Sequence, residues 1–485
     1  MLQQIGAGCI AQPVMLETLV HLMQFSGDLT NRQRSFDLSH IEPSAALSGE
    51  TIFALSTVAG RAALSVVRLS GPRADEVLAA FGVTSLPPPR QAALRRLHDP
   101  QSGAVLDEAL VMRFRAPASY TGEDMVELHL HGGVAVTASV LTALGDLPIC
   151  QPAEAGSFTR RAVANGKMDL TTAEAIADLI DAEGGAQQAQ ALRQMQGDLR
   201  DLFEGWREQL KTMLAHLEAD LEFADEDLPG GVGQAALDAL PALLAAMQAQ
   251  ADDSRGIRLR DGLRVALLGP PNAGKSSILN MLAGREAAIV SARAGTTRDV
   301  IEVAMVLAGV PLTLVDTAGL RAAGDDIERE GVRRARAQAD QADITILVMS
   351  PDTLDDMDES DRLDAVDLRL ANKSDLGPVA RPHEVSLSTV TDKDAGEAAL
   401  LAALRDLVTA KAGRNEAPLL SRERHRSVLR EAIDHLRRAA SPEAAGLELA
   451  AEDLRLAQRV LGRVTGAVDV EQLLDIVFAD FCIGK

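Results

Sequence analysis

The spacing of hydrophobic and polar positions changes along the chain, and each change predicts a different kind of element. Short runs rich in β-branched residues, "TIFALSTV" and "ALSVVRLSG", begin at Thr51, and strand-like alternation returns in "EALVMRFRAP" and "DMVELHLHGG". Between these runs the pattern predicts a helix that ends near Phe81 and a loop at Pro87–Pro89. We therefore expect an α+β domain over residues 49–168.

Helical spacing follows this domain. The residues "TTAE" at 171–174 predict a capping box at the start of a helix, because a Thr and a Glu three positions later can bond free backbone donors. Apolar residues at steps of three and four then predict one long helix with a single buried stripe: Leu192, Met195, Leu199, Leu202, Trp206, Leu210, Met213 and Leu217. We expect Trp206 in the core and a second helix at Ala235–Gln250.

A region of alternating strands and helices interrupts the helical pattern. It begins with "LRVALLG" at Leu263 and lasts to about Lys411, and helical spacing resumes at Ser421. An insertion of this kind is tolerated when its two ends lie close together on a surface. We expect a helical domain at 169–260 and 413–485, an inserted α/β domain at 261–412, and a poorly ordered extension at 1–48.

Composition agrees with several domains and restricts the partners. The chain has 485 residues with 2% aromatics, which favours Ala- and Leu-rich helices over an all-β sandwich. The 48 Lys and Arg against 70 Asp and Glu give a net charge of −22, so any nucleic acid must meet local basic patches. Three widely spaced cysteines and the absence of a long apolar run predict a cytoplasmic protein without a membrane span.

A phosphate-binding motif opens the inserted region. Gly269–Ser276 reads "GPPNAGKS" between an apolar strand and the helix-like "SSILNMLAG". Its glycines let backbone N–H groups turn toward phosphate oxygens, Lys275 supplies positive charge, and the Ser276 hydroxyl can ligate Mg²⁺. In "LTLVDTAG", Asp316 ends a strand where it can hold the Mg²⁺ shell, and Gly319 offers an N–H to the γ-phosphate. The chain is therefore expected to bind a nucleoside triphosphate.

The base is predicted from "NKSD" at Asn372–Asp375, which follows the two phosphate motifs in order. The Asp375 carboxylate can accept from N1–H and the 2-amino group of guanine, which adenine does not present. A buried polar group left unpaired rejects the wrong ligand by roughly 10⁴-fold. We therefore expect GTP rather than ATP.

Hydrolysis needs a water-positioning group other than the usual Gln, because Leu320 follows "DTAG". Glu328 in "DDIEREG" is one candidate, with a solvated charge at a helix end as the alternative reading. A further cation must neutralise the developing charge, and Asn272 in the phosphate loop is the candidate ligand for a monovalent cation there. The segment "SARAGTTRD" is a plausible switch whose Thr297 hydroxyl reaches Mg²⁺.

These motifs, with "PPNAGKSS", "AGTTRD", "DTAGLR" and the terminal "FCIGK", resemble the MnmE (TrmE) family of bacterial tRNA modification GTPases over about Thr51–Lys485. The resemblance implies a multidomain α/β plus α fold: an N-terminal α+β folate-binding domain that forms a homodimer, a helical domain, and an inserted P-loop G domain that dimerises with K⁺. It also implies a heterotetramer with an FAD-dependent partner. This assembly would add an aminomethyl or carboxymethylaminomethyl group at C5 of the wobble uridine of certain tRNAs, with 5-formyl- or methylene-tetrahydrofolate as the folate.

The resemblance also assigns residues, with Glu328, Asn272 and Lys275 in catalysis. The nucleotide-binding set is Asn272, Ala273, Gly274, Lys275, Ser276, Ser277, Ser291, Thr296, Thr297, Asp316, Thr317, Ala318, Gly319, Asn372, Lys373 and Asp375. The Mg²⁺ ligands are Ser276 and Thr297, and the K⁺ ligands are Asn272, Ser291, Arg293, Ala294 and Thr296. The folate-binding residues are Arg68, Glu127, Lys167 and Lys485. Cys482 matches the terminal cysteine of the family, where a chemical role and a buried reduced thiol are both open.

The sequence departs from the family at three places. "AEAGSF" stands where "xPGEF" is common and bears on the folate loop, Arg293 stands where an apolar residue is usual and bears on K⁺, and the segment Ser350–Arg369 is short and acidic. Two other classes of function are weighed against the family: a ribosome-assembly or RNA-binding GTPase switch, and a folate-dependent one-carbon transferase with a regulatory GTPase. The first usually carries an appended basic RNA-binding domain, and the sequence has no such segment.

Overall fold

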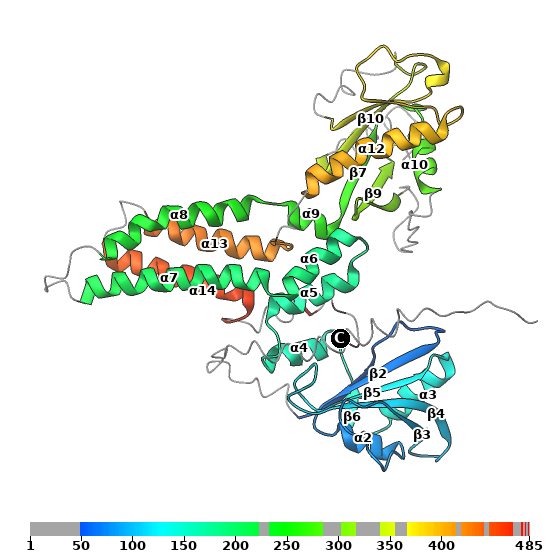
Figure 1. Ribbon diagram of the computed structural model, residues 1–485, viewed down its shortest axis with the longest axis vertical. Coiled ribbons are helices and arrows are strands. Elements are labelled where there is room, and N and C mark those ends of the chain that lie inside the picture. Colours follow the sequence, from blue (N-terminus) through cyan, green and yellow to red (C-terminus); the bar gives the residue numbers. More distant parts are fainter. Residues whose placement is uncertain are drawn as a thin grey trace, which may run out of the picture. The chain divides into compact units, whose positions relative to one another are not determined.

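The computed structural model describes residues 49–222, 232–284, 302–316, 340–354, 366–413, 419–440, 446–468, 477–478, 481 and 484 (Figure 1). Residues Thr51–Lys485 form one compact unit. The extension expected at 1–48 lies outside the described residues. Among the residues that the structure describes, no helix is both long and apolar enough to cross a membrane.

The N-terminal sheet has the strand order β3-β4-β5-β2-β1-β6, in which β1 and β6 are parallel and the other neighbours are antiparallel. Its strands are β1 (Thr51–Leu55), β2 (Leu64–Ser70), β3 (Ala93–His98), β4 (Val105–Phe114), β5 (Met125–His131) and β6 (Cys150–Pro152). Helices α2 (Ala74–Ala80) and α3 (Val134–Gly145) contribute Val77 and Val140 to one core with the inward residues Val67 and Val111. The expected α+β arrangement is confirmed.

Helices before and after the second sheet share one core. They are α7 (Asp198–Glu222), α8 (Val232–Asp252), α13 (Glu423–Ala439) and α14 (Leu447–Thr465). Trp206 is 5% exposed and meets the Phe203 ring edge-on at 5.2 Å, so its expected core position is confirmed. The remaining helices of this region are α4 (Ser157–Ala164), α5 (Leu170–Asp181), α6 (Gly185–Met195) and α9 (Arg255–Asp261).

Two local predictions in this region are wrong. The single long helix is divided into α6 and α7, because Gly197 adopts a left-handed conformation with φ +98° that a helix cannot continue. The predicted capping box does not form either. The N-cap of α5 is Asp169, which accepts from the Thr172 N–H at 2.8 Å. The Thr171 hydroxyl donates to Asp169, and the Glu174 carboxylate is buried against another helix.

The second sheet has the order β12-β11-β10-β7-β9-β8, parallel except for β8. Its strands are β7 (Leu263–Leu268), β8 (Glu302–Leu307), β9 (Val310–Asp316), β10 (Ile344–Met349), β11 (Leu368–Ala371) and β12 (Val385–Ser386). Helices α10 (Lys275–Ala283) and α12 (Lys393–Ala412) pack against it. Because β7 lies between β9 and β10, chain connections depart in both directions around its carboxyl end, which is where ligands bind in such sheets.

Candidate functional sites

The phosphate loop follows β7 directly, and two of its glycines are required by close approach of other backbone or side-chain atoms. Gly269 has φ +130°, and a Cβ there would lie 2.1 Å from the Val348 carbonyl oxygen of β10. Gly274 has φ +96°, and a Cβ there would lie 2.1 Å from Nδ2 of Asn372. Helix α10 begins at the next residue, Lys275, so its free N–H groups face the loop.

Two polar side chains of this motif make hydrogen bonds beside the loop. Lys275 is 4% exposed, and its Nζ donates to the carbonyl oxygens of Gly269 at 2.6 Å and Pro270 at 2.8 Å. The Ser276 hydroxyl donates to Oδ2 of the buried Asp316 at 2.5 Å. The structure thus brings together two oxygen groups of the type that Mg²⁺ prefers.

The loop predicted to read the base is joined to the phosphate loop. Asn372 is 1% exposed, and its side-chain amide donates to the Ala273 carbonyl oxygen at 2.9 Å. Lys373 has a left-handed backbone with φ 56°, and its Nζ donates to Asp352 of the acidic segment at 2.6 Å. The base-reading and phosphate-binding segments therefore form one connected unit.

A residue that the sequence reading missed holds Asp375. The fully buried Ser388 hydroxyl donates to Oδ1 of Asp375 at 2.6 Å. The Ser388 hydroxyl oxygen accepts in turn from the backbone N–H groups of Val390 and Thr391, at 3.2 and 3.1 Å. Ser388 lies two residues after the last strand, in "VSLST", and no motif in the sequence marks it.

The other predicted residues of the nucleotide site divide into two groups. Asn272 lies in the phosphate loop with φ 67°, and Ser277 lies in the first turn of α10. The rest fall outside the described residues: Ser291, Arg293, Ala294, Thr296, Thr297, Thr317, Ala318, Gly319 and Glu328.

In the N-terminal sheet, Arg68 of β2 and Glu127 of β5 are directly opposite in register. The guanidinium donates to Oε1 of Glu127 at 3.1 and 3.2 Å, and the two side chains are 21% and 17% exposed. The guanidinium carbon lies 5.4 Å from the Tyr120 ring centre and 5.8 Å from that of Phe158. Burial raises the pKa of Glu127, but the hydrogen bond with His129 and the Arg68 charge outweigh it and lower that pKa below its ordinary value.

The C-terminal segment meets this pair. The Gly484 carbonyl oxygen accepts from the Ser56 hydroxyl at 3.1 Å and from Arg68 at 3.5 Å. Lys485 and Cys482 lie outside the described residues. Lys167 donates to the Pro117 carbonyl oxygen at 3.0 Å. The structure thus brings Arg68 and Glu127 together beside Gly484, the residue before Lys485.

A phosphate loop at the central strand of a mostly parallel sheet, joined to an "NKSD" loop, defines the class of P-loop GTPases. Two family models match the chain: "GTP-binding protein TrmE N-terminus" at residues 51–167 and "MnmE helical domain" at residues 170–482. The chain belongs to the MnmE family, as the sequence predicted, and it is a GTPase that acts in tRNA modification.

Similarity to known members extends over their whole length. The tRNA modification GTPase MnmE of Parvibaculum lavamentivorans is 52% identical over 441 residues, which cover 90% of this chain and 100% of the relative. The tRNA modification GTPase MnmE of Rhodospirillum rubrum is 52% identical over 457 residues, which cover 90% of this chain and 99% of the relative. A solved structure of the FeoB G domain from T. maritima is 22% identical, covers 31% of this chain and 99% of that chain, and has a TM-score of 0.21.

Proposed function

We propose that the chain is a K⁺-stimulated cytoplasmic GTPase that works with an FAD-dependent partner on the wobble uridine of certain tRNAs. The pair would add an aminomethyl or carboxymethylaminomethyl group at C5 with a folate one-carbon unit. The observation that carries this proposal is the 52% identity to a tRNA modification GTPase over that relative's full length. The domain boundaries expected from the sequence are part of the same proposal.

In the proposed GTPase reaction, each residue acts on the phosphates, the base or the attacking water. Lys275 holds the β- and γ-phosphates, and Ser276 with Asp316 supplies oxygen groups for the Mg²⁺ site. When bound, Mg²⁺ and K⁺ neutralise negative charge that develops on the phosphoryl oxygens. Glu328 orients the water, because Leu320 has no polar atom for that role. The K⁺ ligands would come from Asn272 and from Ser291, Arg293, Ala294 and Thr296.

The arrangement of Arg68 and Glu127 beside the Tyr120 and Phe158 rings supports a folate site. A pteridine ring is planar and carries both donors and acceptors, so it suits a guanidinium and a carboxylate next to aromatic rings. Glu127 is held ionised by its lowered pKa and can accept from ring N–H groups. Lys167 and Lys485 would supply positive charge for the carboxylates of the folate tail.

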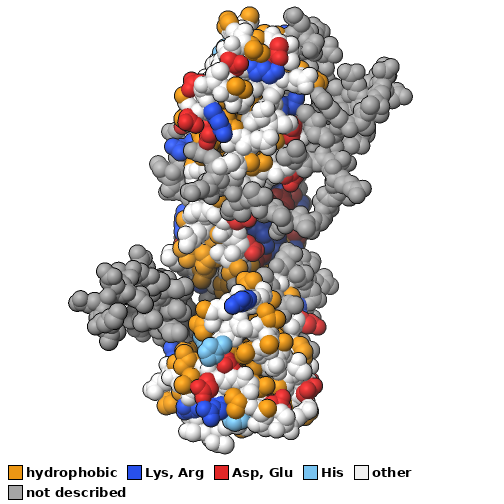
Figure 2. Space-filling model, turned by 90° about the vertical axis from the view of Figure 1, so that its right-hand side faces the viewer, with side chains coloured by type: hydrophobic (Ala, Val, Ile, Leu, Met, Phe, Trp, Pro, Cys, Tyr) orange, Lys and Arg blue, Asp and Glu red, His pale blue; other side chains and the backbone are white. Residues whose placement is uncertain are grey.

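A homodimer through the N-terminal sheet is supported by apolar side chains on its open face. Leu94 and Leu110 are paired across β3 and β4 and are 60% and 45% exposed, and Leu110 is in turn opposite His129 of β5. Figure 2 shows apolar side chains among charged and histidine side chains over this domain, at the lower end of the view. Exposed leucines side by side on a sheet favour contact with an apolar surface, and in a symmetric homodimer that surface is the same sheet of a second copy of the chain.

The decisive experiment measures modified wobble uridine in tRNA from cells with and without the chain. Deletion should remove the modified nucleoside, and the wild-type gene should restore it. Arg68→Gln should restore less of it than Arg73→Gln, which changes an exposed Arg paired only one turn away with Glu76. Normal modification in the deleted cells would refute the proposed function.

The folate and dimer proposals have separate readouts. Titration of the purified chain with 5-formyltetrahydrofolate should show binding that Arg68→Gln weakens and Arg73→Gln preserves. Light scattering should give the mass of a dimer without nucleotide. Leu110→Asp should give a monomer, whereas Leu449→Asp, at a residue 55% exposed in α14, should not change the mass. A wild-type monomer would refute the dimer.

A further inference from the structure

Both chain connections of the nucleotide-binding sheet lie on helix α6. Helix α9 leads into β7, and residues 419–422 lead from α12 into α13. Three glutamines on one face of α6, at spacings of three and four, donate to backbone oxygens of these connections. The pairs are Gln187 to Arg260 at 2.8 Å, Gln190 to Gly256 at 3.2 Å, and Gln194 to Leu419 at 2.6 Å. One helix therefore holds the backbone on both sides of the insertion.

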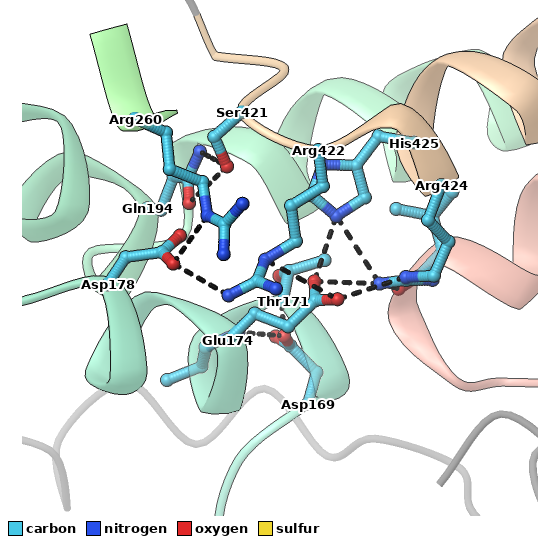
Figure 3. Close-up of polar contacts among 12 residues, drawn as sticks. Asp169, Thr171, Glu174, Asp178, Gln194, Arg260, Ser421, Arg422, Arg424 and His425 are labelled. Carbon is cyan, nitrogen blue, oxygen red and sulfur yellow. Dashed lines mark hydrogen bonds and ion pairs between the residues drawn. The ribbon is translucent and has the colours of Figure 1, made fainter. Parts of the chain in front are cut away.

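A single carboxylate oxygen of α5 also joins the two connections (Figure 3). Oδ1 of Asp178 accepts from Nε of Arg260 at 2.9 Å and from a terminal nitrogen of Arg422 at 2.6 Å. The Asp178 side chain is 11% exposed, and that of Arg422 is 15% exposed. Because Arg260 precedes the insertion and Arg422 follows it, Asp178 ties the incoming and outgoing chain to the same point.

The α5–α6 corner contacts the ends of the strands that lead to the nucleotide. The Ala186 N–H donates to the carbonyl oxygen of Gly309, in the turn between β8 and β9, at 3.0 Å. A Cβ at Gly184 would lie 2.1 Å from that same oxygen, so the contact is close. Strand β9 runs from this turn to Asp316, and β7 runs from α9 to the phosphate loop. Two strands that end at the nucleotide site are thus joined to α5 and α6 at their other ends.

The first turn of α5 packs against the C-terminal segment. Leu170 and Ala173 form a buried cluster with Val477, Phe478 and Phe481, whose two Phe rings lie 5.0 Å apart. The segment continues to Gly484, which accepts from Arg68. Helix α5 therefore contacts the connections of the nucleotide-binding sheet at one end and the C-terminal segment at the other.

We propose that Asp178 is a positioning residue that fixes both connections to α5, so that nucleotide occupancy at the phosphate loop changes the packing of α5 against the C-terminal segment. This inference depends on GTP binding but not on the proposed folate or tRNA chemistry. If the Asp178 carboxylate served stability alone, its replacement would lower the melting temperature but would not change how α5 responds to nucleotide.

The test is hydrogen exchange of the full chain, with and without a non-hydrolysable GTP analogue, Mg²⁺ and KCl. In wild type, amides in Leu170–Asp181 and in 477–481 should change their exchange rate by roughly 5-fold or more on nucleotide binding. Asp178→Asn should remove this difference while the affinity for the analogue changes by less than about 3-fold. The control is Asp181→Asn, an exposed residue with the same charge on the same helix, which should behave as wild type.

Each result decides the proposal. Loss of the exchange difference in Asp178→Asn with retained affinity supports it. A wild-type difference that persists in Asp178→Asn overturns it, as do a wild-type chain without any difference and a variant that loses nucleotide affinity. If Asp178→Asn does not fold, Arg260→Gln, which leaves the Asp178–Arg422 bond in place, is judged by the same criteria.

Discussion

Replacing Glu174 with Gln should destabilise the helical region, because the carboxylate is buried with three cationic or polar partners, Arg422, Arg424 and His425. Glu174 is 1% exposed and binds Arg424 through both oxygens, at 3.0 and 2.7 Å, and His425 at 2.8 Å. Gln keeps the shape but leaves the Arg424 guanidinium, 16% exposed, without its counter-charge. Removal of one partner of a buried pair costs about 3–5 kcal/mol.

The lower end of that range applies here, because Arg424 also donates to the carbonyl oxygens of Arg463 and Val464, each at 3.2 Å. A loss of about 3 kcal/mol corresponds to a melting temperature roughly 6–12 °C lower for a domain of this size. Calorimetry of the full chain measures it, with Glu208→Gln as the control, since the Glu208 side chain is 69% exposed. The control should change stability by less than about 0.5 kcal/mol. If Glu174→Gln and the control Glu208→Gln had the same melting temperature, the buried ion pair would not stabilise this region.

The nucleotide site and the same cluster support the remaining predictions. Asp375→Asn should weaken GTP binding and admit xanthosine triphosphate, because an amide can donate to the extra carbonyl; an unchanged preference in a competition titration would exclude Asp375 as the base reader. Glu328→Ala should lose hydrolysis but keep GTP affinity, since water orientation acts in the transition state, and a wild-type kcat in saturating KCl would contradict this. Hydrolysis should be faster in KCl than in NaCl, by roughly 10³-fold if K⁺ acts as strongly as an arginine finger, and Asn272→Ala should lose the difference; equal wild-type rates would remove the K⁺ role. Burial lowers the pKa of His425 despite the Glu174 carboxylate, so the unfolded chain binds more protons as the pH falls below about 6.5, and the melting temperature should decrease between pH 7.5 and 5.5; a flat profile would refute this.

The phosphate and base motifs could be found from the sequence because their residues are close together in the chain. Gly269–Ser276 forms one loop whose conformation depends on its own glycines. Ser388 could not be found in this way, since it acts on Asp375 only after β12 and the following turn bring the two segments together. One Ser among the hydroxyl residues of "VSLST" carries no local signal of that contact.

The helical region shows the same limit. The apolar stripe predicted that Trp206 is buried, because a stripe of this kind is a property of one helix. The break at Gly197 does not disturb the spacing of the apolar residues, although its left-handed backbone ends α6. The partners of Glu174 follow it by about 250 residues, so the sequence does not show the buried ion pair, and the spacing from Thr171 to Glu174 predicts a cap instead.

The C-terminal glycine connects the sequence signature to the geometry of the N-terminal site. Gly484 has φ +97°, and a Cβ there would lie 2.3 Å from the Leu55 carbonyl oxygen of β1. Only glycine lets the terminal segment approach the strand this closely, and this approach places the Gly484 carbonyl oxygen within reach of Ser56 and Arg68. Lys485 is covalently joined to that carbonyl. A backbone contact that requires glycine at position 484 therefore sets the hydrogen bond between the C-terminal segment and the Arg68–Glu127 pair.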